Sequence, residues 1–521
     1  MLATSPLLLL VDPERQQFLD VVPEDHFLRR LLQAVDFEAF RPILESAYQG
    51  FGRPPVDCIL MLKLELLARQ YRLSDREVIA AARFHIAYRL FLGISLKSSL
   101  PHHTLLTYFR QRLGPERLQQ VFDTLVGQAR RLGLVKDRLR LKDATHIIAN
   151  IAVPSTIRLV AEIRDQLLEA LGPFAAEQVA QEQERAEEIR LATEEAKDEE
   201  RLVQRVSQLR AVLAWAEALP QQARFAQASV SAQEKLQAAL ALAHKVLADR
   251  DDPQAGDKVL SAADPEARCG KHGDYYNGYL VDVSMDADSE LLTAMNVLPA
   301  NGDEGADAVQ LIKQEELAHG NDVERLSIDG AGYRGELLRE LTEPEGLNLE
   351  VFVPPTQRLP LRVFGPEQFT LSADGKVLTC PAGQTTEQWQ RNRVDTGRIF
   401  RFSKKQCGGC PLRDQCLEKA ERKSRSVCKN DYEAEYQAAQ AKARTPEYVA
   451  TRQQHPAIER KLAELVQRHG LRRARYRGRL KVLMQSLLTG LVVNVKRMVR
   501  LLYAPPDSST ETVRAEMVKL G

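Results

Sequence analysis

Hydrophobic side chains recur every three or four positions through the first quarter of the chain, which is the spacing of a helix that buries one face. One such stretch covers residues 56–71. A serine followed three residues later by a glutamate forms a capping box that opens a second predicted helix over residues 74–92, and Pro101 begins a third. Residues 1–135 are therefore predicted to form an all-α N-terminal domain.

The pattern changes to alternation of apolar and polar residues between Arg138 and Asn150, which predicts a β-strand. Asp143 lies on the apolar face of this strand, together with Leu141 and Ile147. An ionised carboxylate on such a face destabilises a fold unless a cation or another polar partner compensates it. Asp143 is therefore a candidate functional residue, although a single inward-facing acid is more often one half of a salt bridge.

Helical sequence rich in Glu, Ala, Leu and Gln returns over residues 156–259 and predicts a helical or coiled-coil insertion. A mixed segment, 260–353, then begins with a predicted hairpin of strands 274–285 and 291–298, followed by a helix up to about residue 318. A short strand at 324–329, a helix at 332–341 and a strand at 347–353 are predicted to follow. Residues 354–450 have a loop-like composition, and helices resume near Thr445.

This order of elements predicts an α/β fold with a mixed sheet. Its core is discontinuous and comprises residues 136–155, 260–353 and 451–503, with a tail at 504–521. No apolar stretch is long enough to span a membrane without a charge, so we expect a soluble cytosolic protein.

Composition and charge narrow the possible partners. The 521 residues are 44% hydrophobic and 27% charged, as in ordinary globular proteins, and the net charge of +1 gives no global attraction for nucleic acid. The segment 471–503 nevertheless contains nine cations and no acid: Arg472, Arg473, Arg475, Arg477, Arg479, Lys481, Lys496, Arg497 and Arg500. We expect the part from Arg472 to Lys481 to contact DNA, as we do Arg110 and Arg112 of the third predicted helix; the alternative is a solvated helix face.

Seven cysteines, an odd number, argue against a disulfide framework. Four of them, Cys380, Cys407, Cys410 and Cys416, form a Cys-x-x-Cys pair with two further thiols, which favours a structural zinc site over reduced, unliganded thiols. Cys428 is a possible substitute ligand, whereas Cys58 and Cys269 are isolated.

Two further acids resemble Asp143 in their placement. Asp329 ends a predicted strand directly before a glycine-rich turn. A helical wheel places Glu459 on the apolar side of its helix and Glu464 on the opposite side, so we expect Glu459 to point inward and Glu464 toward solvent. If the two aspartates and Glu459 converge, they would suit Mg²⁺ or Mn²⁺, and two such ions can drive displacement at a phosphodiester.

A competing motif overlaps Asp329. Residues 330–335 have the pattern Gly-x-Gly-x-x-Gly after a predicted strand, which is the local signature of a dinucleotide-binding turn and would make the chain an oxidoreductase. The carboxylate of Asp329 beside a pyrophosphate and the lack of repeated βα units argue against it. The glycines also fit a plain strand-to-helix turn.

Several motifs together resemble bacterial insertion-sequence transposases of the DDE class with an InsH-type N-terminal domain. The resemblance is carried, in chain order, by residues 73–77, 88–93 and 101–110, by Asp143 to Ala149, by Asp329 to Tyr333, by Ile458 with Glu459, and by 469–478 and 494–497. Cys380 with residues 407–416 is similar to a cysteine-bearing insertion of one branch of these transposases, the 1182-type insertion sequences.

The resemblance implies a ribonuclease-H-like core in which Asp143, Asp329 and Glu459 hold two Mg²⁺ or Mn²⁺ ions. It also implies double-stranded DNA as the partner, both the terminal inverted repeats of the element and the target, and a homodimer in the synaptic complex. A signature of some relatives requires Arg four residues before and Lys seven residues after the glutamate, but His455 and Val466 stand there. A DNA-binding derivative without catalysis is the remaining alternative.

Overall fold

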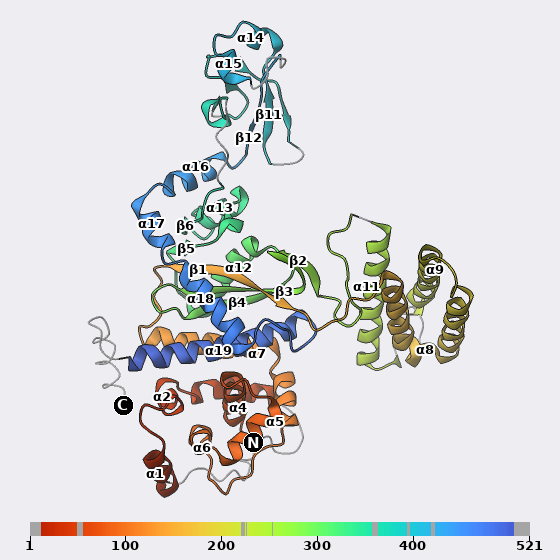
Figure 1. Cartoon of the computed structure of the whole chain (residues 1–521), viewed down its shortest axis with the longest axis vertical. Helices are drawn as coiled ribbons and strands as arrows, with labels where there is room; N and C mark the ends of the chain where they lie inside the picture. Colours follow the sequence, from red (N-terminus) through yellow and green to blue (C-terminus); the bar gives the residue numbers. More distant parts are fainter. Residues whose placement is uncertain are drawn as a thin grey trace.

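The computed structural model describes residues 12–48, 56–219, 225, 227–252, 254–356, 363–372, 374–392, 396–417 and 423–504. Nearly all of the tail predicted at 504–521 therefore lies outside the described residues. The molecule is elongated, with the N-terminal helices at one end, a β-sheet in the middle and the cysteine-bearing segment at the other end (Figure 1). A group of helices projects sideways from the sheet (Figure 1).

The N-terminal region is helical, as predicted, and its helices are α1 (Asp12–Val21), α2 (Phe27–Ala34), α3 (Arg41–Glu45), α4 (Cys58–Gln70), α5 (Asp75–Phe84), α6 (Ile86–Leu92) and α7 (Thr104–Arg131). The capping box of Ser74 and Glu77 is formed. The helix expected over 74–92 divides at His85, whose backbone is extended. A kink in α7 lies at Gly114, which takes a positive φ directly before Pro115.

The central sheet is mixed. Its strands are β1 (Arg140–Ile148), β2 (Arg268–His272), β3 (Asp274–Asp286), β4 (Leu292–Pro299), β5 (Arg325–Ser327) and β6 (Glu350–Phe352). β3 pairs antiparallel with β1, β2 and β4, whereas β1, β5 and β6 are parallel neighbours. The predicted strands and hairpin are confirmed, and β2 is an additional strand.

Helices cover both faces of this sheet. α12 (Glu304–His319) lies on one face, and α7 and α19 (Arg479–Tyr503) lie on the other (Figure 1). By length and composition α19 is apolar enough to cross a membrane, but 83% of its most apolar window is buried inside the protein. The core around α19 joins the sheet to the N-terminal helices, which makes these two parts one hydrophobic unit.

The segment predicted as a helical insertion forms a helical bundle, in which the structure describes α8 (Thr156–Ala192), α9 (Asp198–Glu217) and α11 (Val230–Asp251). Leu167, Leu209 and Leu236, one from each helix, are fully buried. These residues belong to a hydrophobic cluster separate from that of the sheet. The bundle therefore has its own core.

The cysteine-bearing segment is more ordered than its loop-like composition predicts. It contains two three-stranded sheets, β7 (Thr370–Leu371) with β8 (Leu378–Thr379) and β9 (Thr385–Thr386), and β10 (Trp389–Arg391) with β11 (Arg398–Arg401) and β12 (Ser426–Lys429). Two short helices follow, α14 (Lys404–Gly408) and α15 (Arg413–Cys416). Cys407 lies on α14, Cys416 ends α15, and Cys410 lies between the two helices. Phe369, Phe400 and Phe402 contribute to a small core of this segment.

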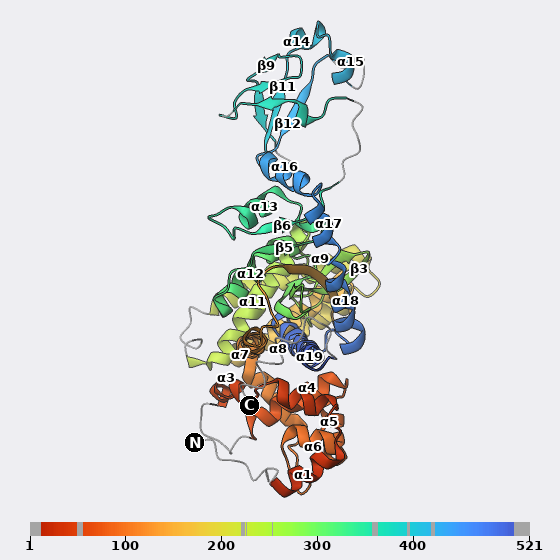
Figure 2. The ribbon, with the colours of Figure 1, turned by 90° about the vertical axis from the view of Figure 1, so that its left-hand side faces the viewer.

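A series of helices returns the chain to the central sheet. α13 (Gly335–Thr342) precedes β6, and α16 (Glu433–Lys442), α17 (Pro446–Arg452) and α18 (Pro456–Ala463) follow the cysteine-bearing segment. Figure 2 shows α16, α17 and α18 descending along one side of the molecule toward α19. α18 contacts β1, so the late glutamate and the first aspartate lie on neighbouring elements.

Candidate functional site

Asp143 occupies the middle of β1, on the face that it shares with the buried residues Leu141 and Ile147. Its Oδ1 accepts a hydrogen bond from the backbone N–H of Ala144 at 2.8 Å. Burial raises the pKa of Asp143 to about 6, and the negative charge of Asp329 acts in the same direction. Burial and the charge of Asp329 therefore outweigh the opposite effects of Lys142 and of the Ala144 N–H on this carboxylate.

Strand register brings Asp329 beside Asp143. In the parallel pair β1 and β5, Leu141 is opposite Ser327, and the two aspartates each follow that pair by two residues. Neighbouring strands are separated by about 4.8 Å. The strand β5 ends at Ser327, two residues earlier than predicted, and Asp329 caps the following turn, because its Oδ1 accepts from the N–H of Ala331 at 3.1 Å.

Glu459 lies in the first turn of α18, and Arg452 is the last residue of α17, the preceding helix. Burial lowers the pKa of Arg452, while the carboxylates of Asp329, Glu459 and Asp143 all act to raise it. The three predicted acids thus act on one guanidinium. The structure brings them to the same region, although they are separated by more than 300 residues in the chain.

Arg452 is held by the strand that precedes Asp329. Its Nη1 donates to the hydroxyl of Ser327 at 3.0 Å and to the carbonyl of Ile328 at 2.9 Å. Nδ1 of His455 lies 3.1 Å from the same hydroxyl. Burial lowers the pKa of His455 to about 4, so the imidazole is neutral at pH 7.

Sequence reasoning missed Arg452 because a break between α17 and α18 separates it from Glu459. An arginine seven residues before a helical glutamate was a visible signal, but helical spacing does not continue across the break. Glu304, at the start of α12, was also missed. Burial raises its pKa and the charge of Asp329 adds to that rise, so Glu304 is a fourth acid near the two aspartates.

The helical-wheel prediction for Glu459 and Glu464 is wrong. Glu459 is exposed, whereas Glu464 is half-buried and pairs with Lys496 at 2.7 Å and with Lys461 at 3.3 Å. Burial opposes ionisation of Glu464, but these two cations keep its pKa below the ordinary value. The apolar side of that wheel was defined partly by Leu465 and Val466, which lie in the π-helix Glu464–Arg468, where the rotation is not 100° per residue.

The expectation that Arg110 contacts DNA is also wrong. The side chain of Arg110 is 11% exposed and pairs with Glu65 at 2.5 Å and with Asp75 at 2.6 Å. Glu65 is 1% exposed, so this arginine balances a buried charge inside the N-terminal helices. Arg112 is exposed and lies over the ring of Tyr48, with 5.2 Å to the ring centroid.

The basic segment predicted from Arg472 to Lys481 is mainly a loop rather than a helix face, since α19 begins only at Arg479. Backbone hydrogen bonds pair this loop with the end of β1, from Ile148 to the carbonyl of Arg472 at 2.9 Å and from Ala474 to the carbonyl of Ile148 at 2.9 Å. The loop therefore continues the edge of the strand that carries Asp143. Its exposed cations are Arg473, Arg475, Arg477 and Lys481, while Arg472 and Arg479 are half-buried.

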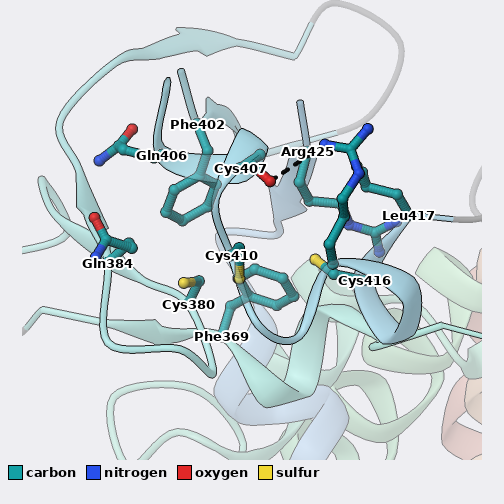
Figure 3. Close-up of a pocket in the computed structure, with 11 residues that line it drawn as sticks. Phe369, Cys380, Gln384, Phe402, Gln406, Cys407, Cys410, Cys416, Leu417 and Arg425 are labelled. Atoms are coloured by element: carbon teal, nitrogen blue, oxygen red, sulfur yellow. Dashed lines mark hydrogen bonds between the residues drawn. The ribbon is translucent and has the colours of Figure 1, made fainter. Parts of the chain in front are cut away.

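All seven cysteines are free thiols. Cys380, Cys407, Cys410 and Cys416 line one pocket, and Figure 3 shows the side chains of Cys380, Cys410 and Cys416 around it. Burial raises the pKa of Cys416, and the other three thiols act in the same direction. Cys428 is bound by the Asn392 amide at 3.4 Å, Cys58 is buried in α4, and Cys269 is exposed on β2.

Two protein-family models match the chain. The model described as a transposase domain (DUF772) matches residues 16–112, which form most of the N-terminal helical region. The model described as a transposase DDE domain matches residues 379–499, which include the four cysteines, Glu459 and the basic loop. Together the two matches support an insertion-sequence DDE transposase. Asp143 and Asp329 of this transposase lie outside both matched ranges, and no solved structure matches the chain.

The glycine-rich turn of the transposase serves packing. Gly330–Gly332 form a 3₁₀ turn capped by Asp329, and a Cβ atom on Gly332 would lie 2.7 Å from the side chain of Ile328. Helix α13 starts only at Gly335. Because both family models describe transposase domains, they argue against the oxidoreductase alternative. The glycine-rich turn holds Asp329 beside β1.

DDE transposases use divalent metal ions, which carboxylate oxygens can bind. Among the residues that the structure describes, no three Asp, Glu, His or Cys side chains lie close enough together to hold a metal ion. The oxygen donors of Asp143, Asp329 and Glu459 nevertheless suit Mg²⁺ or Mn²⁺ chemically. The raised pKa of Asp143 also indicates a carboxylate that a cation would stabilise.

Proposed function

We propose that this transposase cleaves DNA at the ends of its own insertion sequence and joins the freed 3′-hydroxyl to target DNA, with Asp143, Asp329 and Glu459 as metal ligands. The observation that carries the proposal is the register of β1 against β5, which places Asp143 and Asp329 two residues beyond the same strand pair, while α18, which carries Glu459, contacts β1. Two divalent ions, when bound, would activate the attacking oxygen and stabilise the leaving oxygen of the phosphodiester.

The residues of the chain position these ligands. β1 carries Asp143, Asp329 follows the end of the adjacent strand β5, and Ser327, through Arg452, connects this strand to the segment that leads to Glu459. A fixed guanidinium among three acids also limits their mutual repulsion before a metal ion binds. The proposed ligands are therefore held in place by strands, helices and hydrogen bonds that do not involve the metal ion.

The strand arrangement supports a ribonuclease-H-like core. Five strands follow the spatial order β4, β3, β1, β5 and β6, and only β3 runs opposite to the others. A three-stranded meander is thus followed by two parallel strands that are reached through helical connections. We also propose that this core is discontinuous, and that it is interrupted by a helical insertion at 156–259 and a cysteine-bearing insertion at 354–450.

We place double-stranded DNA, both terminal repeat and target, along the basic loop. The exposed cations of the loop extend from the end of β1, five residues beyond Asp143, and Arg112 supplies a further cation on the N-terminal helices. Contacts of this kind fix a duplex through its phosphates and weaken steeply as salt is added. A homodimer would hold two element ends in one synaptic complex.

The cysteine pocket is the proposed site of a structural Zn²⁺ ion. Four thiols from two turns and two short helices line the same pocket, and thiolates are the ligands that zinc prefers. Cys380, Cys407, Cys410 and Cys416 would hold the ion and link the two small sheets. No role in cleavage is assigned to it.

The decisive experiment is strand cleavage of a duplex that carries the element's end, with Mg²⁺ present. Asp143→Asn, Asp329→Asn and Glu459→Gln should each lower the rate by at least about 100-fold, since each removes a ligand worth several kcal/mol. Glu464→Gln, five residues from Glu459 and paired with Lys496, is the matched control and should retain cleavage. Equal loss in both glutamate variants would refute the assignment, and DNA binding by the wild type without any cleavage would indicate an inactive derivative.

A further inference from the structure

The first half of α7 presents an uncharged polar face to solvent. Because the kink at Gly114 divides α7, residues 104–113 form a helical segment of their own. The buried side of this segment consists of Leu106, Phe109, Arg110 and Leu113. The exposed side has the same helical spacing and consists of Thr104, Thr107, Tyr108 and Gln111. We refer to these four exposed residues as the α7 face.

The side chains of the α7 face are of the kinds that recognise bases. Hydroxyl and amide groups both donate and accept hydrogen bonds, and a glutamine amide can pair with the edge of an adenine. Tyr108 is 55% exposed, so its ring and hydroxyl are open to a partner. The major groove of DNA admits an α-helix, and residues near the start of such a helix contact the base edges. The composition of this face therefore suits base readout better than phosphate binding.

A cation borders the α7 face on the neighbouring helix α5. Nε of Arg76 donates to Nε2 of His103, the residue that precedes α7, at 3.2 Å. The hydroxyl of Thr107 donates to the carboxylate of Asp75 at 3.4 Å. These two contacts hold the start of α5 against the start of α7. Arg76 is exposed, as is Arg112 on α7 itself, so positive charge lies beside the polar face and complements a polyanion.

The same helices contact the basic loop. Nη2 of Arg69, near the end of α4, donates to the hydroxyl of Tyr476 in the loop at 3.3 Å. The charge of Asp75 acts to raise the pKa of Arg475, against the effect of burial. Asp75 is therefore near both the basic loop and Thr107 of the α7 face. Figure 2 shows α5 on the same side of the molecule as α18, the helix that follows α17.

We propose that the α7 face reads the base sequence of the element's terminal repeat in the major groove of double-stranded DNA, while the basic loop holds neighbouring phosphates. This inference rests on the proposed function, because it takes the terminal repeat as the DNA. The core around α19 joins the N-terminal helices to the sheet, so the fold fixes the distance between the α7 face and Asp143. The repeat would therefore be read at a constant number of base pairs from the cleaved bond.

Two glutamines of the same helix provide the test. Gln111 belongs to the α7 face, whereas Gln120 is exposed beyond the kink. Gln111→Ala should weaken binding of a duplex that carries the element's end at least tenfold, the size of effect expected for one lost base contact. Its affinity for a scrambled duplex of the same length should stay within about twofold of the wild type. Gln120→Ala should bind both duplexes as the wild type does.

A substitution in the basic loop separates phosphate binding from base readout. Arg473 is an exposed cation of the loop, and Arg473→Ala should weaken binding of both duplexes equally and lower the salt dependence by about one counterion. Gln111→Ala should leave the salt dependence unchanged. An equal loss of affinity for both duplexes in Gln111→Ala would overturn the assignment of the α7 face to base readout.

The possible failures are distinguishable. If the wild type binds neither duplex, the proposed function fails together with the α7 face. If the wild type cleaves the element's end but binds both duplexes equally, or if Gln111→Ala keeps the wild-type preference, the α7 face is refuted and the proposed function stands. A changed sedimentation of Gln111→Ala with an unchanged preference would make the face a contact between copies of the chain, which also refutes the proposal.

A second variant keeps the test decisive if Gln111→Ala lowers the thermal transition. Tyr108→Ala removes another exposed side chain of the α7 face and should reduce the preference for the element's end at least fivefold. An unchanged preference in this variant, with the thermal transition of the wild type, would refute the α7 face.

Discussion

Arg452 and Ser327 are joined by a hydrogen bond of 3.0 Å between the guanidinium and the hydroxyl. Ser327 is fully buried two residues before Asp329, and Arg452 lies seven residues before Glu459. The contact therefore ties the strand of one predicted ligand to the helices that carry another. The distance between the carboxylates of Asp329 and Glu459 therefore depends on a hydrogen bond in which neither carboxylate takes part.

Removal of this hydroxyl should loosen the metal site without removing a ligand. Ser327→Ala is expected to raise the Mg²⁺ concentration needed for half-maximal cleavage by roughly 10-fold, as loss of supporting contacts does in other metal sites. Cleavage at saturating Mg²⁺ should be largely kept. Ser284→Ala, which removes a buried hydroxyl on β3, is the control, and an equal shift in both variants would contradict the prediction.

Asp143 should make the metal-free protein less stable as the pH rises. Its pKa is about 6 in the folded chain, against 3.8 for an aspartate in water, so the folded state binds more protons between these limits. Stability should therefore fall by roughly 2–3 kcal/mol between pH 4 and pH 7 from this group. Asp143→Asn should remove that loss, as measured by denaturant unfolding in EDTA, and identical pH profiles for the two proteins would contradict it.

Arg110 and Arg112 lie on the same helix but should differ sharply in their effect on stability. Arg110→Ala leaves Glu65 buried without its partner and should cost about 3–5 kcal/mol. Arg112→Ala changes an exposed side chain and should cost less than about 1 kcal/mol. Urea unfolding of both variants measures the difference, and similar midpoints would show that the Glu65 pair contributes little.

Metal content provides a test of the cysteine pocket. Protein purified without added metal should contain one zinc ion per chain, and Cys410→Ser should lose that zinc and lower the melting temperature. Cys269→Ser changes an exposed cysteine of β2, outside the pocket, and should retain the metal. Zinc absent from the wild type, with the four pocket thiols open to alkylation, would reject the site.

Local pattern was sufficient for the elements whose signal lies within a few residues. The alternation around Asp143 predicted β1, and Ser74 with Glu77 predicted the start of α5. The strands of the cysteine-bearing segment were missed because each spans only two to four residues, too few for periodicity to appear.

Contacts between segments that are distant in the sequence could not be predicted without the folded structure. Proximity of Asp143 to Asp329 depends on the register of β1 against β5, which no spacing in the sequence specifies. Glu464 was placed outward because a regular wheel was continued into a π-helix. Arg110 shows the same limit, since whether a basic side chain meets solvent or a buried Glu65 depends on how α4 packs against α7.

The helical bundle leaves and rejoins the sheet at nearly the same point. Ile148 at the end of β1 and Arg268 at the start of β2 are both paired with Gly278 of β3, where a Cβ atom would lie 2.0 Å from the carbonyl of Ile147. A short glycine tether could therefore bridge the gap if the bundle were excised. Because that bundle packs on itself, the same junction could accept a foreign domain, such as a fluorescent protein, as a tag that leaves the rest of the chain in place.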